Sequence, residues 1–258
     1  MEHKGQLRVE GMQIYAEWRR PKVSGKPTLV FLHDGLGSVE TLRQLPEMVA
    51  DRLALPAFAY DRLGYGRSDA GFPWPTFFME EAAKLLPKVL DAAGITDCVL
   101  VGHSDGGSVT LLYAGTAPAR VRAAVTISAH IFIDAKTDEQ MIRHRKMVAD
   151  NDIPGYMTRF HGARGPDVLR AWTGALAHPD YPRWDLRPAI RGIRAPLLAL
   201  QGANDEYGMP SQLEGIKEAV PHAEIELMPG IAHFPQIEAP DRIADRVAGF
   251  IAQCINRV

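Results

Sequence analysis

The sequence is poor in the features that are typical of membrane proteins, nucleic-acid-binding proteins and disulfide-rich proteins. It has two cysteines, Cys98 and Cys254, which form neither a CxxC motif nor a metal-ligand spacing. The formal net charge is only −2, which gives no reason to expect a nucleic-acid partner. No apolar run approaches the roughly 20 residues that span a bilayer, and the charged segment MEHKGQLRVE lacks the apolar core of a signal peptide. We therefore expect reduced cysteines, no membrane partner and a cytoplasmic location.

Short apolar runs alternate with segments of helical periodicity along most of the chain. Hydrophobic residues make up 46% of the sequence, as in ordinary globular proteins. We predict strands at 12–18, 27–33, 56–61, 98–102, 123–128, 196–202 and 223–229, and helices at 39–54, 77–94, 106–116, 210–220 and 240–255. This order predicts a single α/β domain over 1–258, with a mostly parallel central sheet and helices on both faces.

One segment breaks the alternation. Residues 131–190 hold no strong strand pattern and are punctuated by glycine and proline. A capping-box pattern, Thr137 followed by Gln140, predicts a helix that starts there. About 60 residues is far too long for an ordinary connection, so we interpret 131–190 as a helical cap inserted before the last two strands.

The sharpest motif is VLVGHSDGG at 99–107, where a predicted strand turns directly into a helix. Ser104 lies at the turn, with Gly102 and Gly106 two residues away on each side. A turn this tight strains the backbone, and the glycines remove Cβ atoms that would collide with the strand and the helix. The strain lifts the serine hydroxyl off the sheet, beside the free N–H groups of a helix N-terminus. We interpret Ser104 as a nucleophile.

A serine nucleophile needs a base, and the base needs an acid that orients it. His233 follows the last predicted strand, and Asp205 follows the strand before it. Both positions are carboxyl ends of strands, where open α/β sheets bind their ligands. Glu206 and Asp134 remain alternatives for the acid.

The stretch FLHDGLGS at 31–38 ends a buried strand and predicts an oxyanion site. Its backbone N–H groups, from Gly35 or from Leu36, would face the N–H of Asp105 and stabilise a tetrahedral intermediate. The sequence leaves the choice between Gly35 and Leu36 open. We interpret His33 as a packed residue at the strand end.

Five motifs in order, FLHDGLGS, YDRLGYGRS, VLVGHSDGG, LLALQGANDE and GIAHFPQIEAP, resemble the α/β-hydrolase superfamily over nearly the whole chain. The resemblance implies Ser104 as nucleophile, Asp205 as acid and His233 as base. It also implies that Asp61 and Arg62 form a pair that stabilises a turn and is not catalytic. Serine at the nucleophile position argues against the haloalkane dehalogenase and epoxide hydrolase branches, which use aspartate there.

Two readings of Asp105 stay open. The Ser-Asp-Gly-Gly run is similar to that of valacyclovirase-like hydrolases, in which the acid meets a substrate amino group. The interpretation that we favour is that the carboxylate stabilises the N-terminus of the helix on which it lies.

Apolar and aromatic side chains of the cap and its root are candidates for the substrate pocket, although the same side chains could hold the cap on the sheet. These candidates, besides Asp105, are His130, Phe132, Met157, Phe160, Trp172 and Trp184. An inward-turned Arg159 or Arg164 would favour an acidic substrate.

Together these patterns predict a serine hydrolase that cleaves small carboxylic esters, thioesters or lactones through an acyl-enzyme. A carbon–carbon bond hydrolase and a non-catalytic binding protein of the same fold are the alternatives. Without a GxGxxG or a GxxxxGK[ST] motif, no cofactor is implied, and no metal site is predicted. We expect a small-molecule substrate as the partner, and the oligomeric state stays open.

Overall fold

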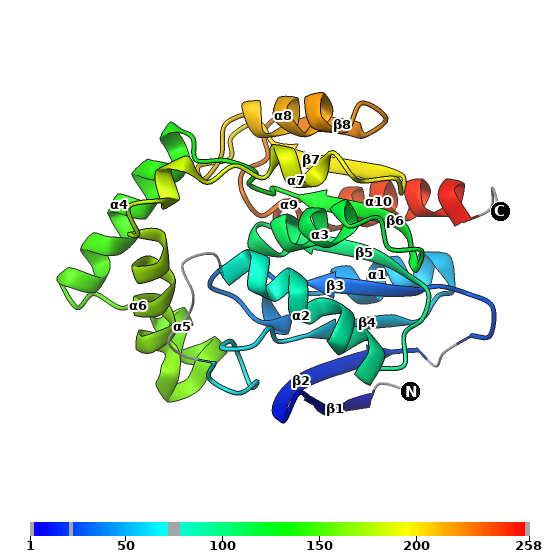
Figure 1. Cartoon of the computed structure of the whole chain (residues 1–258), viewed down its shortest axis with the longest axis horizontal. Helices are drawn as coiled ribbons and strands as arrows, with labels where there is room; N and C mark the ends of the chain where they lie inside the picture. Colours follow the sequence, from blue (N-terminus) through cyan, green and yellow to red (C-terminus); the bar gives the residue numbers. More distant parts are fainter. Residues whose placement is uncertain (1–2, 21–22, 72–77, 256–258) are drawn as a thin grey trace.

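An eight-stranded sheet forms the centre of the computed structural model, which describes residues 3–20, 23–71 and 78–255 (Figure 1). Its spatial order is β1-β2-β4-β3-β5-β6-β7-β8. Strand β2 pairs antiparallel with both of its neighbours, β1 and β4, and all other neighbouring strands are parallel. The strands are β1 (His3–Val9), β2 (Met12–Arg19), β3 (Thr28–Leu32), β4 (Ala57–Tyr60), β5 (Cys98–His103), β6 (Val121–Ile127), β7 (Leu197–Gly202) and β8 (Glu224–Met228).

Helices cover both faces of the sheet, as predicted, because the central strands are apolar on both sides (Figure 1). Helices α1 (Leu45–Leu53) and α10 (Pro240–Ile255) pack on one face, around Phe31 and Val101. Helices α2 (Phe78–Ala92), α3 (Asp105–Gly115) and α8 (Ser211–Ala219) pack on the other, around Val30 and Leu100. The short helix α9 (Pro235–Glu238) leads into α10.

Two local predictions need correction. The predicted helix at 39–54 is divided into a 3-10 turn, η1 (Val39–Leu42), and α1, because Arg43 has a positive φ of 53°. Pro46 lies in the first turn of α1, where no backbone N–H is needed, and does not interrupt it. Strand β1 was not predicted, since most of its side chains are at least partly exposed and it lacks a clear apolar alternation.

The cap is a helical insertion between β6 and β7, at the carboxyl ends of the strands (Figure 1). It contains α4 (Ala135–Ala149), α5 (Gly155–His161), η2 (Gly162–Arg164), α6 (Gly165–Leu176), η3 (Tyr181–Arg183) and α7 (Arg187–Ile190). The predicted start of its first helix at Thr137 is wrong. The N-cap is Asp134, whose side chain accepts the Thr137 N–H at 2.9 Å, so the helix begins one turn earlier.

In the described ranges, every helix is too short or too polar to cross a membrane. Cys98 is buried and Cys254 is half-buried, and neither forms a disulfide.

Candidate active site

Ser104 occupies a strained turn between β5 and α3. Its backbone angles are φ 52° and ψ −123°, a left-handed conformation that is unfavourable for a residue with a side chain. A Cβ at Gly102 would overlap the Gly106 carbonyl, and a Cβ at Gly106 would overlap the Leu32 carbonyl at the end of β3. Both glycines are therefore required by close backbone contacts, in agreement with the sequence prediction.

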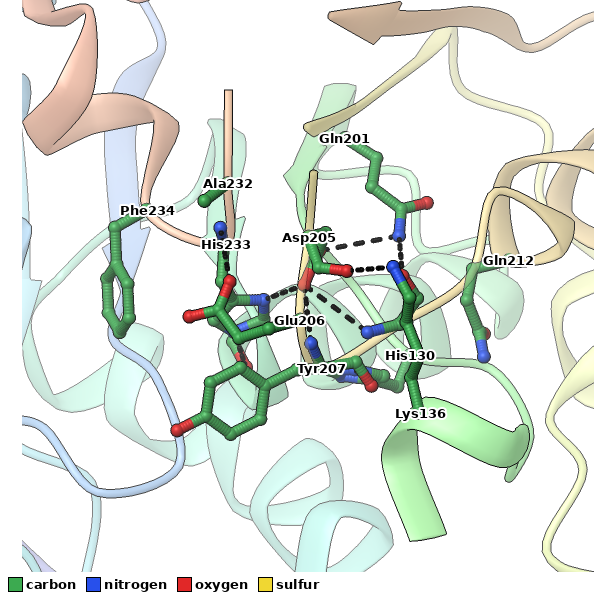
Figure 2. A network of polar contacts seen from close by, with 12 residues as sticks. His130, Lys136, Gln201, Asp205, Glu206, Tyr207, Gln212, Ala232, His233 and Phe234 are labelled. Carbon is green, nitrogen blue, oxygen red and sulfur yellow. Dashed lines mark hydrogen bonds and ion pairs between the residues drawn. The ribbon is translucent and has the colours of Figure 1, made fainter. Parts of the chain in front are cut away.

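The hydroxyl of Ser104 lies at the end of a chain of hydrogen bonds with His233 and Asp205. Ser104 Oγ is 3.0 Å from His233 Nε2, and His233 Nδ1 is 2.8 Å from Asp205 Oδ1. Figure 2 shows the carboxylate and the imidazole facing each other. Because an ionised carboxylate only accepts, Nδ1 carries the proton and Nε2 accepts from the Ser104 hydroxyl. All three residues are at most 6% exposed, so water competes little for these contacts.

The Asp205 carboxylate remains ionised despite its burial. Burial raises its pKa. This effect is outweighed by the hydrogen bond and positive charge of His233 and by the Tyr207 N–H, at 2.8 Å from Oδ1, which together bring the pKa down to about 2. The Gly208 N–H adds a donor at 3.3 Å. This carboxylate therefore carries a negative charge beside the imidazole at neutral pH.

The two alternative acids lie elsewhere. Glu206 is exposed and accepts from the backbone N–H of His233, at 3.3 Å. Asp134 caps α4, and its Oδ2 accepts from Met209 N at 2.7 Å and Gln212 Nε2 at 2.8 Å. Neither carboxylate contacts the imidazole, so the geometry favours Asp205.

The root of the cap is bonded to the loop that carries Asp205 (Figure 2). Lys136 Nζ donates to the backbone carbonyl of Asp205. Thr137 Oγ1 donates to the carbonyl of Tyr207 at 2.9 Å. With the Asp134–Met209 contact, these bonds join the first turn of α4 to residues 205–209.

The loop after β3 is held by a buried network that the sequence did not reveal. The Asp34 carbonyl accepts from His33 Nδ1 and from Arg62 Nη2, each at 2.8 Å, while His33 Nε2 accepts the Arg62 N–H at 3.0 Å. His33 is buried at the strand end, as expected, but it also bonds both neighbouring segments. The expected Asp61–Arg62 pair is absent from the part of the chain that is described. The Asp61 carboxylate instead accepts the N–H groups of Val39 and Arg67.

Residues 29–246 match the model of the alpha/beta hydrolase family. The chain belongs to this family. It is 25% identical over 252 residues to an sn-1-specific diacylglycerol lipase of Mus musculus, which covers 88% of this chain and 81% of the relative. It is 30% identical over 213 residues to a bifunctional esterase/perhydrolase of Acinetobacter calcoaceticus, covering 70% and 76% of the two chains. An enol-lactonase from Burkholderia xenovorans has the same fold, with a TM-score of 0.74 at 19% identity over 96% of this chain and all of that one.

In this hydrolase a cavity of about 330 Å³ opens over Ser104 and His233. Gly35, Leu36 and Asp105 lie on its wall, as do the predicted pocket residues His130, Phe160 and Trp172. Its remaining apolar wall was missed by the sequence analysis, and includes Met79, Met141, Tyr156, Leu176, Tyr181 and Tyr207. These side chains come from α2, the cap and the loop after β7, which only the folded chain brings together.

Three predicted pocket residues lie outside the cavity wall of the hydrolase. Phe132 lies under the Arg187 guanidinium, 5.0 Å from its ring centroid. Met157 is fully buried in a small cluster that joins the cap to Tyr65, in the loop after β4. Trp184 stacks on Tyr181 and donates Nε1–H to Glu80 at 2.9 Å. All three hold the cap together or onto the sheet.

The structure also shows the surroundings of the charged side chains that were candidates for binding a charged substrate. Trp172 Nε1 donates to Asp105 Oδ2 at 3.1 Å, so this carboxylate has a neutral partner in the cap. Arg159 is exposed, and Arg164 Nη2 donates to the carbonyls of Gly66 and Ser68. Neither arginine lines the cavity, which removes that argument for an acidic substrate.

Burial lowers the pKa of His130, and the neighbouring His233 charge lowers it further. Because the Tyr207 carbonyl can only accept, His130 Nε2 donates to it, at 3.1 Å. This neutral imidazole therefore supports the loop that follows Asp205 and forms part of the cavity wall.

Proposed function

We propose that this protein hydrolyses small carboxylic esters, thioesters or lactones through an acyl-enzyme on Ser104. The observation that carries the proposal is the buried chain from Ser104 Oγ to His233 Nε2, 3.0 Å, and from His233 Nδ1 to Asp205 Oδ1, 2.8 Å. This arrangement activates a hydroxyl for attack on an acyl carbon.

In the first half-reaction Ser104 Oγ attacks the substrate carbonyl while His233 Nε2 takes the hydroxyl proton. The tetrahedral intermediate collapses, and His233 returns the proton to the departing alcohol, thiol or hydroxyl oxygen. Water then attacks the acyl-enzyme by the same route, and the carboxylic acid leaves. Throughout, Asp205 holds the imidazole in the required tautomer and stabilises the imidazolium.

Two backbone N–H groups would stabilise the oxyanion, that of Asp105 at the start of α3 and that of Gly35. In a trans peptide the C=O and N–H bonds point in opposite directions. The Asp34 carbonyl is bonded on the interior side by His33 and Arg62. The N–H of the same peptide, that of Gly35, is therefore directed away from these donors. Because Gly35 also lies on the cavity wall, this favours Gly35 over Leu36.

The cavity supports a substrate with an apolar acyl or alcohol group. Its wall is mainly aromatic and aliphatic, and its size suits a small molecule. The names of the relatives, an esterase/perhydrolase, a lipase and a lactonase, are consistent with acyl transfer to water.

The decisive experiment combines p-nitrophenyl butyrate hydrolysis with fluorophosphonate labelling and peptide mass spectrometry. We expect wild type to turn over the ester and to carry the label on Ser104, and Ser104→Ala to do neither while keeping its circular dichroism spectrum. A folded wild type without label or turnover would favour a binding protein. Weak ester turnover with strong cleavage of a ring-cleavage diketone would favour a carbon–carbon bond hydrolase.

A further inference from the structure

Arg62 carries a buried guanidinium with unusual surroundings. The residue is 2% exposed and follows β4. Nη2 donates to the Asp34 carbonyl, and the guanidinium lies 4.4 Å from the ring centroid of Tyr65. Among the described residues, Nε and Nη1 are buried without a well-formed hydrogen bond, the guanidinium interacts with the Tyr65 side chain, and no carboxylate forms an ion pair with it. A buried cation held in this way destabilises the fold, which calls for an explanation in function.

We propose that Arg62 is a positioning residue for acyl transfer, which orients the Asp34–Gly35 peptide and places a positive charge behind the oxyanion. The proposal rests on the proposed function, since it assigns a role in stabilising the tetrahedral intermediate formed at Ser104. Its basis is the pair of contacts that Arg62 makes with the loop after β3, one through its side chain and one through its backbone.

The backbone contact of Arg62 fixes the state of His33. Its N–H is donated to His33 Nε2 at 3.0 Å, so Nε2 is unprotonated and the proton resides on Nδ1. Nδ1 then donates to the Asp34 carbonyl at 2.8 Å. Burial and the Arg62 charge lower the pKa of His33 well below its usual range, which keeps this tautomer neutral. Arg62 therefore holds the Asp34 carbonyl both directly and through His33.

Two donors on one carbonyl affect the whole peptide. They fix its plane, and they polarise it so that the Gly35 N–H becomes a stronger donor. The positive charge of Arg62 lies behind the Asp34–Gly35 peptide. It adds a favourable potential at the oxygen of the reacting carbonyl, which this peptide would face. Negative charge develops on that oxygen only as the tetrahedral intermediate forms, so these effects stabilise the transition state more than the bound ester.

The test compares Arg62→Met with the matched control Arg164→Met. Arg164 also donates to carbonyls of the loop after β4, those of Gly66 at 2.7 Å and Ser68 at 2.8 Å, but it does not contact Asp34. For R62M we expect kcat on p-nitrophenyl butyrate to fall about ten- to a hundredfold, with KM changed less than about threefold. The Ki of an alkyl trifluoromethyl ketone, which forms a tetrahedral adduct with serine, should rise by the same factor as kcat/KM falls. R164M should keep kcat within about twofold.

A folded R62M with kcat and ketone Ki close to wild type would overturn the proposal. A loss of kcat that the ketone Ki does not follow would also overturn it, because it would indicate a structural role only. If R62M does not fold by circular dichroism, Arg62→Lys and Arg62→Gln are measured by the same comparison of ketone Ki with kcat/KM. Absence of fluorophosphonate labelling in wild type would contradict the proposed function itself, whereas labelled wild type with an unaffected Arg62 variant would contradict only this role.

Discussion

His103 Nε2 donates to the backbone carbonyl of His233 at 2.9 Å, which joins the residue before the nucleophile to the imidazole that faces it. Because a carbonyl only accepts, Nε2 carries the proton. The other ring nitrogen, Nδ1, is buried without a hydrogen-bond partner among the described residues. A neutral His103 therefore helps to hold the loops of Ser104 and His233 at their hydrogen-bonding distance.

This contact predicts a pH-dependent contribution to stability. Burial, together with the His233 charge, lowers the pKa of His103 to about 4, whereas a histidine in the unfolded chain has a pKa near 6.5. Between these values the unfolded chain binds the proton and the folded chain does not, so stability falls as pH drops from about 6.5 toward 4. Wild type should be more stable than His103→Gln at pH 7. We expect this difference in the free energy of unfolding to shrink by about 2 kcal/mol between pH 7 and pH 5.

Urea unfolding at the two pH values measures this difference. The exposed His222 gives the control, since His222→Gln should show no such change. An equal pH dependence in wild type and His103→Gln would contradict the prediction.

Asp205→Asn should nearly abolish turnover without unfolding the protein. An amide at this position can stabilise the wrong imidazole tautomer and cannot stabilise the imidazolium, and we expect kcat to fall about ten thousandfold. The matched variant is Glu206→Gln, which alters the adjacent exposed carboxylate and should retain kcat within about threefold. The measurement is kcat on p-nitrophenyl butyrate. Equal losses in both variants would argue that the loop, and not the carboxylate of Asp205, is responsible.

Gly106→Ala should destabilise the hydrolase, because the added Cβ would overlap the carbonyls of Leu32 and His33 at the end of β3. We expect a loss of about 3 kcal/mol in the free energy of unfolding. Gly174→Ala, on the exposed side of α6 with open space around it, should stabilise the protein by up to about 1 kcal/mol. Thermal and urea denaturation of both variants test the contrast, and a neutral Gly106→Ala would refute the close contact.

Asp105→Asn distinguishes the two readings of that carboxylate. It lies at the start of α3 and accepts from Trp172 Nε1, so we expect a structural role. In that case the variant loses about 0.3–1 kcal/mol of stability and its kcat/KM falls equally for a valine ester with a free amino group and for the matched neutral ester. A loss at least tenfold greater on the amino ester would show instead that Asp105 binds a substrate cation.

Much of the fold and the reacting residues could be predicted from local patterns. Short apolar runs marked the central parallel strands, because a strand buried on both faces has few polar positions. Ser104, Asp205 and His233 each follow a strand at its carboxyl end, and parallel strands bring those ends to one edge. Their meeting is thus a consequence of topology.

The cavity wall and the loop network were not predictable in the same way. Trp172 and Trp184 are both buried cap residues, yet one faces the cavity and the other packs on Tyr181. Composition does not distinguish these environments, because both favour large apolar side chains. The bond from Arg62 to the Asp34 carbonyl joins segments that are adjacent only through the pairing of β3 with β4.

The bonds from Asp134, Lys136 and Thr137 to residues 205–209 have a consequence for redesign. Replacing the cap with a different one, in order to change the substrate range, would remove the residues that hold Asp205 in position. Grafts that retain the opening turn of α4 should keep their turnover. Those cut at the end of β6 should lose it even when the new lid leaves ample space for substrate.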